Sequence, residues 1–456
     1  MNPAGTPRAK RGRLAILAAL LVATAFCSCG PIASPDAAVL MDAGLPQGDA
    51  ASPRDAAQGS DLGIPDLAEA DGRPVDAGAS DLAPSSDLTP STDGGGADLS
   101  LPGCAGFGSV KLIPLPHTVS SVAIGDLDGD GHQDIVETAY TESALSVLFG
   151  DGKGGFANPV IYPQGCPLHG VANGDLNGDG RLDVVVIGCQ ANVDNVQVFM
   201  NQGQGKLAAP VSYGGNLNQR LGFPQLTDFN NDGKLDVAVA NPANGAFDPG
   251  SIAIFLGKGN GMLGPPLISP GDLAPWQLAS ADFNGDGRLD LAAYTAEPAN
   301  PGPAPATILM LGDGKGGLTK SQTISQPGVL YNLLGSADIN EDGHADLLIA
   351  GTKSLHAFWG PAFLQESQFP FPAASWVAIG DINGDGHADV AGIGNEQDDL
   401  LAVALGDGRG GLAAATICQA GDGTEAVAIG DLDGDGKDDV VVGNGPGKAL
   451  TVFLTK

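Results

Sequence analysis

The stretch GDLDGDGHQD at residues 125–134 places four aspartates within nine positions, with glycines between them. The pattern returns six more times, as GDLNGDGRLD, TDFNNDGKLD, ADFNGDGRLD, ADINEDGHAD, GDINGDGHAD and GDLDGDGKDD. The first aspartates of the seven loops stand at residues 126, 175, 228, 282, 338, 381 and 431. The spacing is about fifty residues, a period typical of repeat architectures in which similar units pack side by side.

Each acidic loop lies between two short apolar runs rich in β-branched residues, such as SVAIG before the first loop and DIVETA after it. Such runs favour strands. A third apolar run follows in every unit, and four units continue with a glycine-rich turn suited to a hairpin and then a fourth run. Four antiparallel strands per unit predict an all-β fold, a seven-bladed β-propeller.

The two ends of residues 104–456 supply a check on this count. The seventh unit stops after its third strand, at TVFLTK, whereas GFGSVKLIPLP at residues 106–116 is a strand that precedes the first unit. We therefore expect the N-terminal strand to complete the last blade and close the ring.

The first 29 residues have the character of an export signal. Four basic residues precede the apolar run at 14–26, which is about half the length needed to span a bilayer. Two fates stay open: ordinary cleavage after Ala23–Ala25, or a lipoprotein signal with Cys27 or Cys29 as the lipidated residue. The expected location is outside a bacterial cell, as a secreted protein or an outer-surface lipoprotein.

Residues 30–103 consist mainly of Ala, Asp, Pro, Ser and Gly, and no aromatic residue occurs between Phe26 and Phe107. A segment of this composition cannot bury enough apolar surface to offset its chain entropy. The sequence therefore predicts a disordered linker that acts as a spacer.

The charge balance excludes one class of partner. The chain carries 21 Lys and Arg against 53 Asp and Glu, a net charge of −32. Such a charge repels nucleic acid and anionic lipid headgroups. We expect no nucleic-acid partner, and membrane contact only through an N-terminal lipid anchor.

Counted from its first aspartate, each loop has Asp at position one, Asp or Asn at three, Asp at five, Gly at six and Asp at nine. This spacing surrounds one hard cation with oxygen atoms, which suits calcium, whereas zinc prefers Cys and His. We predict up to seven Ca²⁺ ions. The expected side-chain ligands are Asp126, Asp128, Asp130, Asp134; Asp175, Asn177, Asp179, Asp183; Asp228, Asn230, Asp232, Asp236; Asp282, Asn284, Asp286, Asp290; Asp338, Asn340, Asp342, Asp346; Asp381, Asn383, Asp385, Asp389; and Asp431, Asp433, Asp435, Asp439.

Position seven is basic in every loop. We expect its backbone carbonyl to bind calcium while its side chain points outward and offsets nearby carboxylates; a ring of catalytic bases is the alternative. These residues are His132, Arg181, Lys234, Arg288, His344, His387 and Lys437.

The EF-hand shares the opening of this pattern but requires a bidentate Glu at position twelve and flanking helices. Here position twelve is Glu137 in the first loop and a residue without a carboxylate in the other six. The expected flanks are strands, so an EF-hand or dockerin is rejected.

Together these features resemble the FG-GAP or VCBS repeat family, which includes the seven-bladed propeller of integrin α subunits. The resemblance covers about residues 104–456 and rests on the acidic loops, the pair Phe149–Gly150 and the motif Ala157–Pro159. It implies calcium bound between the first two strands of a blade. Integrins usually fill only some blades, whereas all seven loops here carry the ligands, as in secreted bacterial and fungal relatives.

The sequence contains no GxSxG elbow and no HExxH motif, which favours binding over catalysis. We expect a non-enzymatic, adhesin-like or lectin-like module for an extracellular glycan or protein. A calcium-dependent polysaccharide lyase, or another propeller enzyme, is the alternative.

The face opposite the acidic loops is the expected ligand face, because it carries the longer insertions and the blade entrances. Aromatic and polar side chains there suit a sugar or a peptide. Packing between blades is the alternative role for Trp276 and Trp376. The candidate ligand-face residues are His169, Arg220, Trp276, Tyr331, Trp376 and Glu425.

Four cysteines fall within the expected propeller, and export makes disulfides plausible. Cys166 precedes the first strand of its blade and Cys189 ends the second, so we predict that they pair. Cys104 and Cys418 are expected at opposite ends of neighbouring outer strands, and no bond between them is predicted.

Overall fold

The computed structural model describes the propeller region of the chain. The described residues are 104–456 except 191–192, 215–216, 218–220, 243–249, 270–274, 296–305, 326–333, 352, 373–375 and 395–398. The expected signal at 1–29 and linker at 30–103 lie outside them, as do Arg220 and Tyr331.

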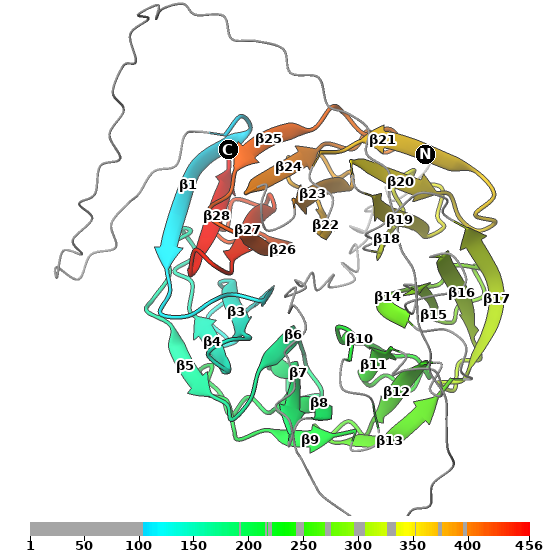
Figure 1. Ribbon diagram of the computed structural model, residues 1–456, viewed down its shortest axis with the longest axis horizontal. Coiled ribbons are helices and arrows are strands. Elements are labelled where there is room, and N and C mark those ends of the chain that lie inside the picture. Colours follow the sequence, from blue (N-terminus) through cyan, green and yellow to red (C-terminus); the bar gives the residue numbers. More distant parts are fainter. Residues whose placement is uncertain are drawn as a thin grey trace, which may run out of the picture. The chain divides into compact units, whose positions relative to one another are not determined.

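The described chain forms seven four-stranded antiparallel sheets around a ring (Figure 1). This confirms the predicted seven-bladed, all-β propeller. In the ranges that the structure describes, no helix is long and apolar enough to cross a membrane.

Each of the first six blades takes four consecutive strands, ordered from the centre of the ring outward. These strands are β2 (Ser121–Gly125), β3 (Asp134–Ala139), β4 (Ala144–Leu148), β5 (Val160–Pro163); β6 (Leu168–Gly174), β7 (Asp183–Gln190), β8 (Val193–Phe199), β9 (Val211–Tyr213); β10 (Gln225–Thr227), β11 (Asp236–Asn241), β12 (Ser251–Gly257), β13 (Leu263–Ile268); β14 (Pro275–Ala281), β15 (Asp290–Thr295), β16 (Ala306–Gly312), β17 (Leu318–Ser325); β18 (Leu334–Ala337), β19 (Asp346–Gly351), β20 (Ser354–Phe358), β21 (Glu366–Pro370); and β22 (Trp376–Gly380), β23 (Asp389–Ile393), β24 (Leu400–Ala404), β25 (Thr416–Gln419).

The seventh blade joins the two ends of the propeller. Its inner strands are β26 (Thr424–Gly430), β27 (Asp439–Asn444) and β28 (Ala449–Thr455), and its outer strand is β1 (Phe107–Pro114). The pairing runs from Phe107 opposite Thr455 to Pro114 opposite Ala449. The predicted closure of the ring by the N-terminal strand is therefore confirmed.

The core lies between neighbouring blades. Strands such as β3 and β27 are buried along their whole length, because each inner sheet is covered on both faces. Val136 of blade one and Val184 of blade two, for example, are fully buried in one cluster. Burying one such side chain contributes about 1.5–3 kcal/mol, so the interfaces between blades hold the ring together.

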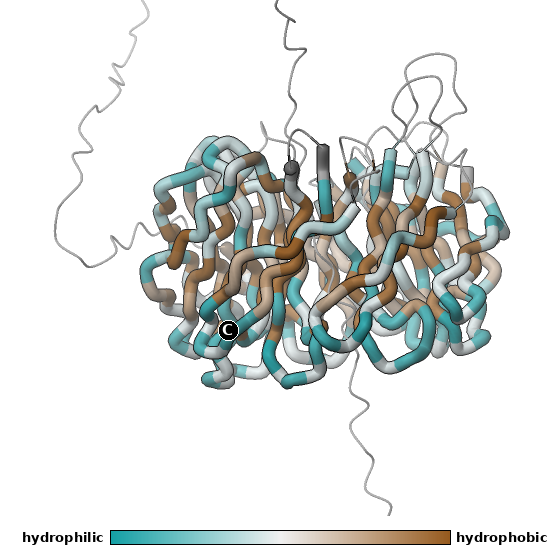
Figure 2. Tube along the Cα trace, turned by 90° about the horizontal axis from the view of Figure 1, so that it is seen from below, coloured by the Kyte–Doolittle hydropathy of each residue, from teal (hydrophilic) through white to brown (hydrophobic). Residues whose placement is uncertain are grey.

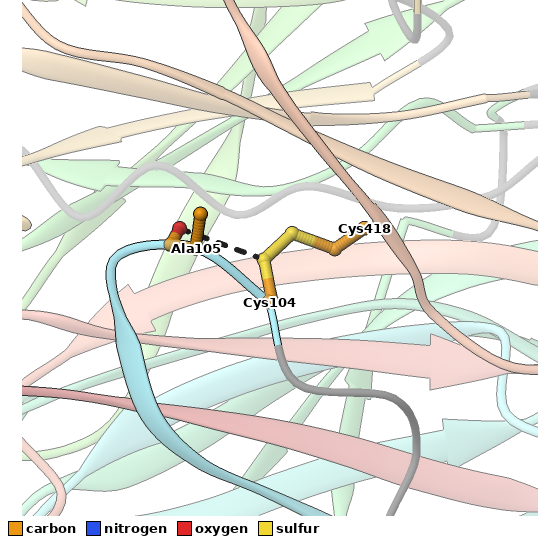
Figure 3. Close-up of a disulfide and its surroundings, with 3 residues drawn as sticks. All are labelled: Cys104, Ala105 and Cys418. Carbon is orange, nitrogen blue, oxygen red and sulfur yellow. Dashed lines mark hydrogen bonds between the residues drawn. A yellow bond between two sulfur atoms is a disulfide. The ribbon is translucent and has the colours of Figure 1, made fainter.

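The outer strands place Cys104 beside Cys418, and the two form a disulfide with a Cα–Cα distance of 5.4 Å (Figure 3). The expectation that these residues lie too far apart is wrong. Sheet twist accumulates across four strands, so the outer strands run along the circumference (Figure 1). The end of β25 consequently lies beside the start of β1.

The predicted Cys166–Cys189 bond is not tested, because the side chain of Cys189 lies outside the described part of the chain. The backbone pairing of Leu168 with Gly188 places both cysteines at the same end of blade two. The bond stays a prediction.

We expect Cys418→Ser to lower the melting temperature at a fixed calcium concentration, because the bond closes a segment with a sequence separation of 314 residues. Disulfides typically contribute about 2–4 kcal/mol. Nonreducing peptide mapping should recover residues 104 and 418 in one cross-linked species. Recovery of both as free thiols, with an unchanged melting curve for the variant, would contradict this expectation.

Candidate metal centres in the acidic loops

All seven acidic loops lie on one face of the ring. Each loop connects the first strand of a blade to the second, and the third strand ends at the same side because the sheets are antiparallel. Strand β28 ends there, and Figure 2 shows hydrophilic loops along this lower side of the propeller. The opposite face carries the blade entrances and the turns between second and third strands.

Within a loop, backbone N–H groups orient the first three acidic or amide side chains. In loop one, Asp126 Oδ2 accepts from the Gly131 N–H at 3.0 Å, and Asp128 Oδ1 accepts from the Asp130 N–H at 3.1 Å. Asp130 Oδ1 accepts from the His132 N–H at 2.8 Å. The same three bonds recur in every loop. Each loop therefore folds around its own side-chain oxygens.

The glycine at position six is required by the backbone. Gly131 has φ of +90°, a conformation that side chains disfavour, and its counterparts in the other loops have φ between +80° and +89°.

The aspartate at position nine ties the loop to the blade. Asp134 is fully buried; its Oδ2 accepts from the Leu127 N–H, and its Oδ1 from the Gly150 N–H at the end of the third strand, both at 2.8 Å. The equivalent pair of bonds is present in each of the other six loops. One carboxylate thus fixes three strands of a blade.

Burial makes the ionised form of this aspartate costly. It raises the pKa of Asp134 to about 6, although the N–H groups of Gly150 and Leu127 partly offset the effect. The same cause raises the pKa of Asp183, Asp236, Asp389 and Asp439 to about 6, and it raises those of Asp290 and Asp346 as well. A cation next to these carboxylates would stabilise their charged form.

Two loops bring three carboxylates together with oxygen atoms within 4.8 Å of one another. One group is Asp126, Asp128 and Asp130, and the other is Asp431, Asp433 and Asp439. These are the two loops with Asp at position three. The other five have Asn there, which supplies an amide oxygen and less charge. The donors are all oxygen atoms, so the residues fit a hard divalent cation.

The basic side chains at position seven interact with their own loops and with neighbouring hairpins. Lys234 lies 3.1 Å from Asp232, Arg288 lies 3.8 Å from Asp286, and Arg181 contacts Asp179. His132 lies over Gly152 in the hairpin between the third and fourth strands. Arg181, Lys234 and Arg288 therefore offset carboxylate charge in their own loops, and the carbonyl role of position seven stays a prediction.

The candidate ligand-face residues are described in four of six cases. His169 packs against Tyr140, with ring centroids 4.9 Å apart. Trp276 is half-buried, and Glu425 is buried. The ligand-face role of all six residues stays a prediction.

Trp376 contacts Phe223, a residue that the sequence analysis did not identify. It is 5% exposed and packs edge-on against Phe223, with ring centroids 5.7 Å apart. Phe223 precedes β10 of blade three, whereas Trp376 begins β22 of blade six, so the contact joins blades that are not sequence neighbours. Packing, the alternative role, accounts for the buried ring of Trp376.

A second missed group lies on the outer strands of blade five. Ser354 Oγ is 2.8 Å from His356 Nε2, and His356 Nδ1 is 2.5 Å from Glu366 Oε1. This is the order of nucleophile, base and acid. No motif search finds it, because β20 and β21 bring the residues together only in the folded sheet. Glu366 is 46% exposed, so solvent screens its charge.

The comparisons with solved structures find matches that cover two thirds or more of this chain at low sequence identity. A lectin from Agrocybe aegerita, described as recognising non-reducing terminal N-acetylglucosamine, is 19% identical, with 67% of this chain and 81% of that chain covered and a TM-score of 0.49. BBS1N in complex with ARL6DN, soaked with lead, is 12% identical, with coverages of 76% and 97% and a TM-score of 0.47. The same complex soaked with mercury is 12% identical, with coverages of 75% and 94% and a TM-score of 0.48. No curated protein matches the chain significantly.

The family comparison coincides with the acidic loops. The model described as FG-GAP-like repeat matches residues 126–186, 175–239, 228–293, 338–392 and 381–442, together more than half of the chain. Each matched segment begins at the first aspartate of one loop and includes the following loop. The chain therefore belongs to the FG-GAP-like repeat family.

Proposed function

We propose that this protein is a calcium-stabilised propeller that acts as a binding module for an extracellular glycan or protein. The observation that carries the calcium part is the identical hydrogen-bonded arrangement of side-chain oxygens in all seven loops. The ions would be held by the side chains at positions one, three, five and nine and by the position-seven carbonyl. The two clusters of three carboxylates, one in loop one and one in loop seven, support this assignment most directly.

Calcium would supply the positive charge that these loops need. Seven ions would change the formal net charge from −32 to about −18. A site with a dissociation constant of about 10 μM would gain about 2.7 kcal/mol in about 1 mM calcium. Several such sites together would account for a large share of the stability of a typical domain.

We expect a chelator to lower the melting temperature steeply and calcium to restore it, because removal of the ion leaves carboxylates repelling one another around a buried aspartate. Magnesium should restore it poorly, since it demands a rigid octahedral shell. The measurement is a melting curve with EDTA, then with each ion in excess. Metal analysis that finds no calcium, together with a melting curve that EDTA leaves unchanged, would overturn the calcium proposal.

The binding role rests on the family and on the division of the propeller into two faces. The acidic face is occupied by the loops that would hold calcium, which leaves the opposite face for recognition. Export, as a secreted protein or through lipidation of Cys27 or Cys29, would place the module where glycans and surface proteins are available.

We expect Trp276→Ala to weaken ligand binding on a glycan array, because this half-buried ring retains exposed surface on the proposed ligand face. Trp376→Ala should instead lower the free energy of unfolding by about 3 kcal/mol, because it removes packing against Phe223. The melting temperature should fall accordingly. The matched control is Ile161→Ala on the outer strand β5, which should change neither. Equal binding by Trp276→Ala and the unsubstituted protein would remove Trp276 from the recognition site.

An enzyme is the second candidate, either a polysaccharide lyase or a hydrolase, and the chain Ser354–His356–Glu366 is the observation that favours it. If the protein is a binding module, a polysaccharide incubated with it should stay intact, and a fluorophosphonate probe should not label the protein. Labelling that disappears in Ser354→Ala and His356→Gln would favour a hydrolase. Cleavage with unsaturated sugar products would favour a lyase.

A further inference from the structure

Neighbouring acidic loops contact each other at a recurring place. Position seven of one loop lies over position four of the preceding loop: His344 approaches Gly285, and Lys437 approaches Gly384. A glycine at position four leaves room for this basic side chain. Loops four and five, and loops six and seven, are therefore in contact through these two pairs.

Loops six and seven are joined by two hydrogen bonds. Asp438, at position eight of loop seven, accepts from the Asp381 N–H through Oδ2 at 2.9 Å. Its own N–H donates to the Asp381 carbonyl oxygen at 3.0 Å. Asp381 is the first ligand position of loop six, so loop seven holds both backbone polar groups of that residue.

The carboxylate at this place is a departure from the repeat. In loops two and three, position eight is Leu182 or Leu235, whose side chain packs over Gly125 or Gly174 of the preceding blade. In loop seven, Asp438 occupies the same place over Gly380. The charge of Asp438 interacts unfavourably with those of Asp381 and Asp431, one from each site.

Loops five and six are joined by an ion pair. Glu341 replaces glycine at position four of loop five, with φ of +56°, and contacts His387 at position seven of loop six. A non-glycine residue in this conformation is strained by about 1 kcal/mol or more. The contact with His387 offsets part of that cost and links the two loops.

We propose, on the basis of the calcium function proposed above, that Asp438 and the pair Glu341–His387 couple sites five, six and seven, so that an ion in one raises the affinity of the next. An ion in site seven orders loop seven, and Asp438 then holds the first ligand residue of site six in place. The three aspartates of site six would retain net negative charge after binding one divalent ion. The residual charge keeps the electrostatic penalty for an ion in the neighbouring site small, so the ordering of loop seven and of Asp381 sets the sign of the coupling.

A tryptophan makes the coupling measurable. Of the three tryptophans, Trp276 and Trp376 lie at the start of first strands, on the face opposite the loops. Trp359 follows β20 on the acidic side: the next residue, Gly360, donates to Asp346 of site five, and the indole lies over Gly410 of blade six. Terbium luminescence sensitised by Trp359 therefore reports on sites five and six, with Trp359→Phe as the signal control.

The test is a terbium titration, with calcium competition, of the full chain in two backgrounds. In the otherwise unsubstituted protein, disabling site seven with Asp433→Asn and Asp435→Asn should weaken terbium binding at the Trp359-sensitised sites by about fivefold or more. In the Asp438→Leu background, which restores the leucine of loops two and three, the same disabling should change binding by less than about twofold. Asp232→Asn in loop three is the remote control and should have no effect.

Three outcomes are distinguishable. An equal fold-change in both backgrounds, or none in either, would overturn the coupling while leaving calcium binding intact. Absence of any bound terbium or calcium would overturn the proposed function and the coupling together. Asp438→Asn, which removes the charge and retains the side-chain size, repeats the test if Asp438→Leu melts early in saturating calcium.

The link between loops five and six has its own variant. Glu341→Gly restores the residue found at position four in loops one, two, four, six and seven. In this variant, disabling site five with Asp342→Asn should no longer change calcium binding at site six. The measurement is calorimetry. Persistence of that effect in Glu341→Gly would show that the ion pair does not transmit it.

Discussion

A buried carboxylate that accepts hydrogen bonds from two separate parts of the chain is the constraint on which each blade depends. The position-nine aspartate accepts one N–H from the acidic loop and another from the end of the third strand, so a single side chain sets the geometry of three strands. Its burial disfavours the charge, and the two N–H donors compensate only in part. The acidic loop is therefore both the candidate metal site and the connection that fixes the blade.

The interfaces between blades are largely apolar, with buried polar contacts such as Asn173 Nδ2 donating to the Ile124 carbonyl oxygen at 3.1 Å. Neighbouring blades meet through apolar side chains, and the ring closes when β1 pairs with β28. At the same junction, Lys448 of blade seven lies 2.7 Å from Glu142 of blade one, which also accepts from Thr118. The β1–β28 pairing and the ion pair thus hold the first and last blades together, whereas the Cys104–Cys418 bond links the closing strand to blade six.

The number of blades, the closing strand and the acidic loops were predictable because each depends on local sequence and on a period that repeats seven times. The position of Cys104 beside Cys418 was not, since it depends on twist accumulated across a whole sheet. The contact of Phe223 with Trp376 depends on which blades face each other across the ring, and the hydrogen bonds of Asp438 to Asp381 depend on how consecutive blades pack. Such contacts leave no spacing in the sequence that a motif could detect.

The disulfide also determines how the propeller would respond to mechanical force. All residues before Cys104 join the propeller at that cysteine, next to the strand that closes the ring. Tension on that side reaches the covalent bond to β25 of blade six before it reaches the hydrogen bonds between β1 and β28. Pulling would load a sulfur–sulfur bond instead of unzipping a strand, so a tethered propeller would keep its ring closed under tension that would otherwise peel β1 away.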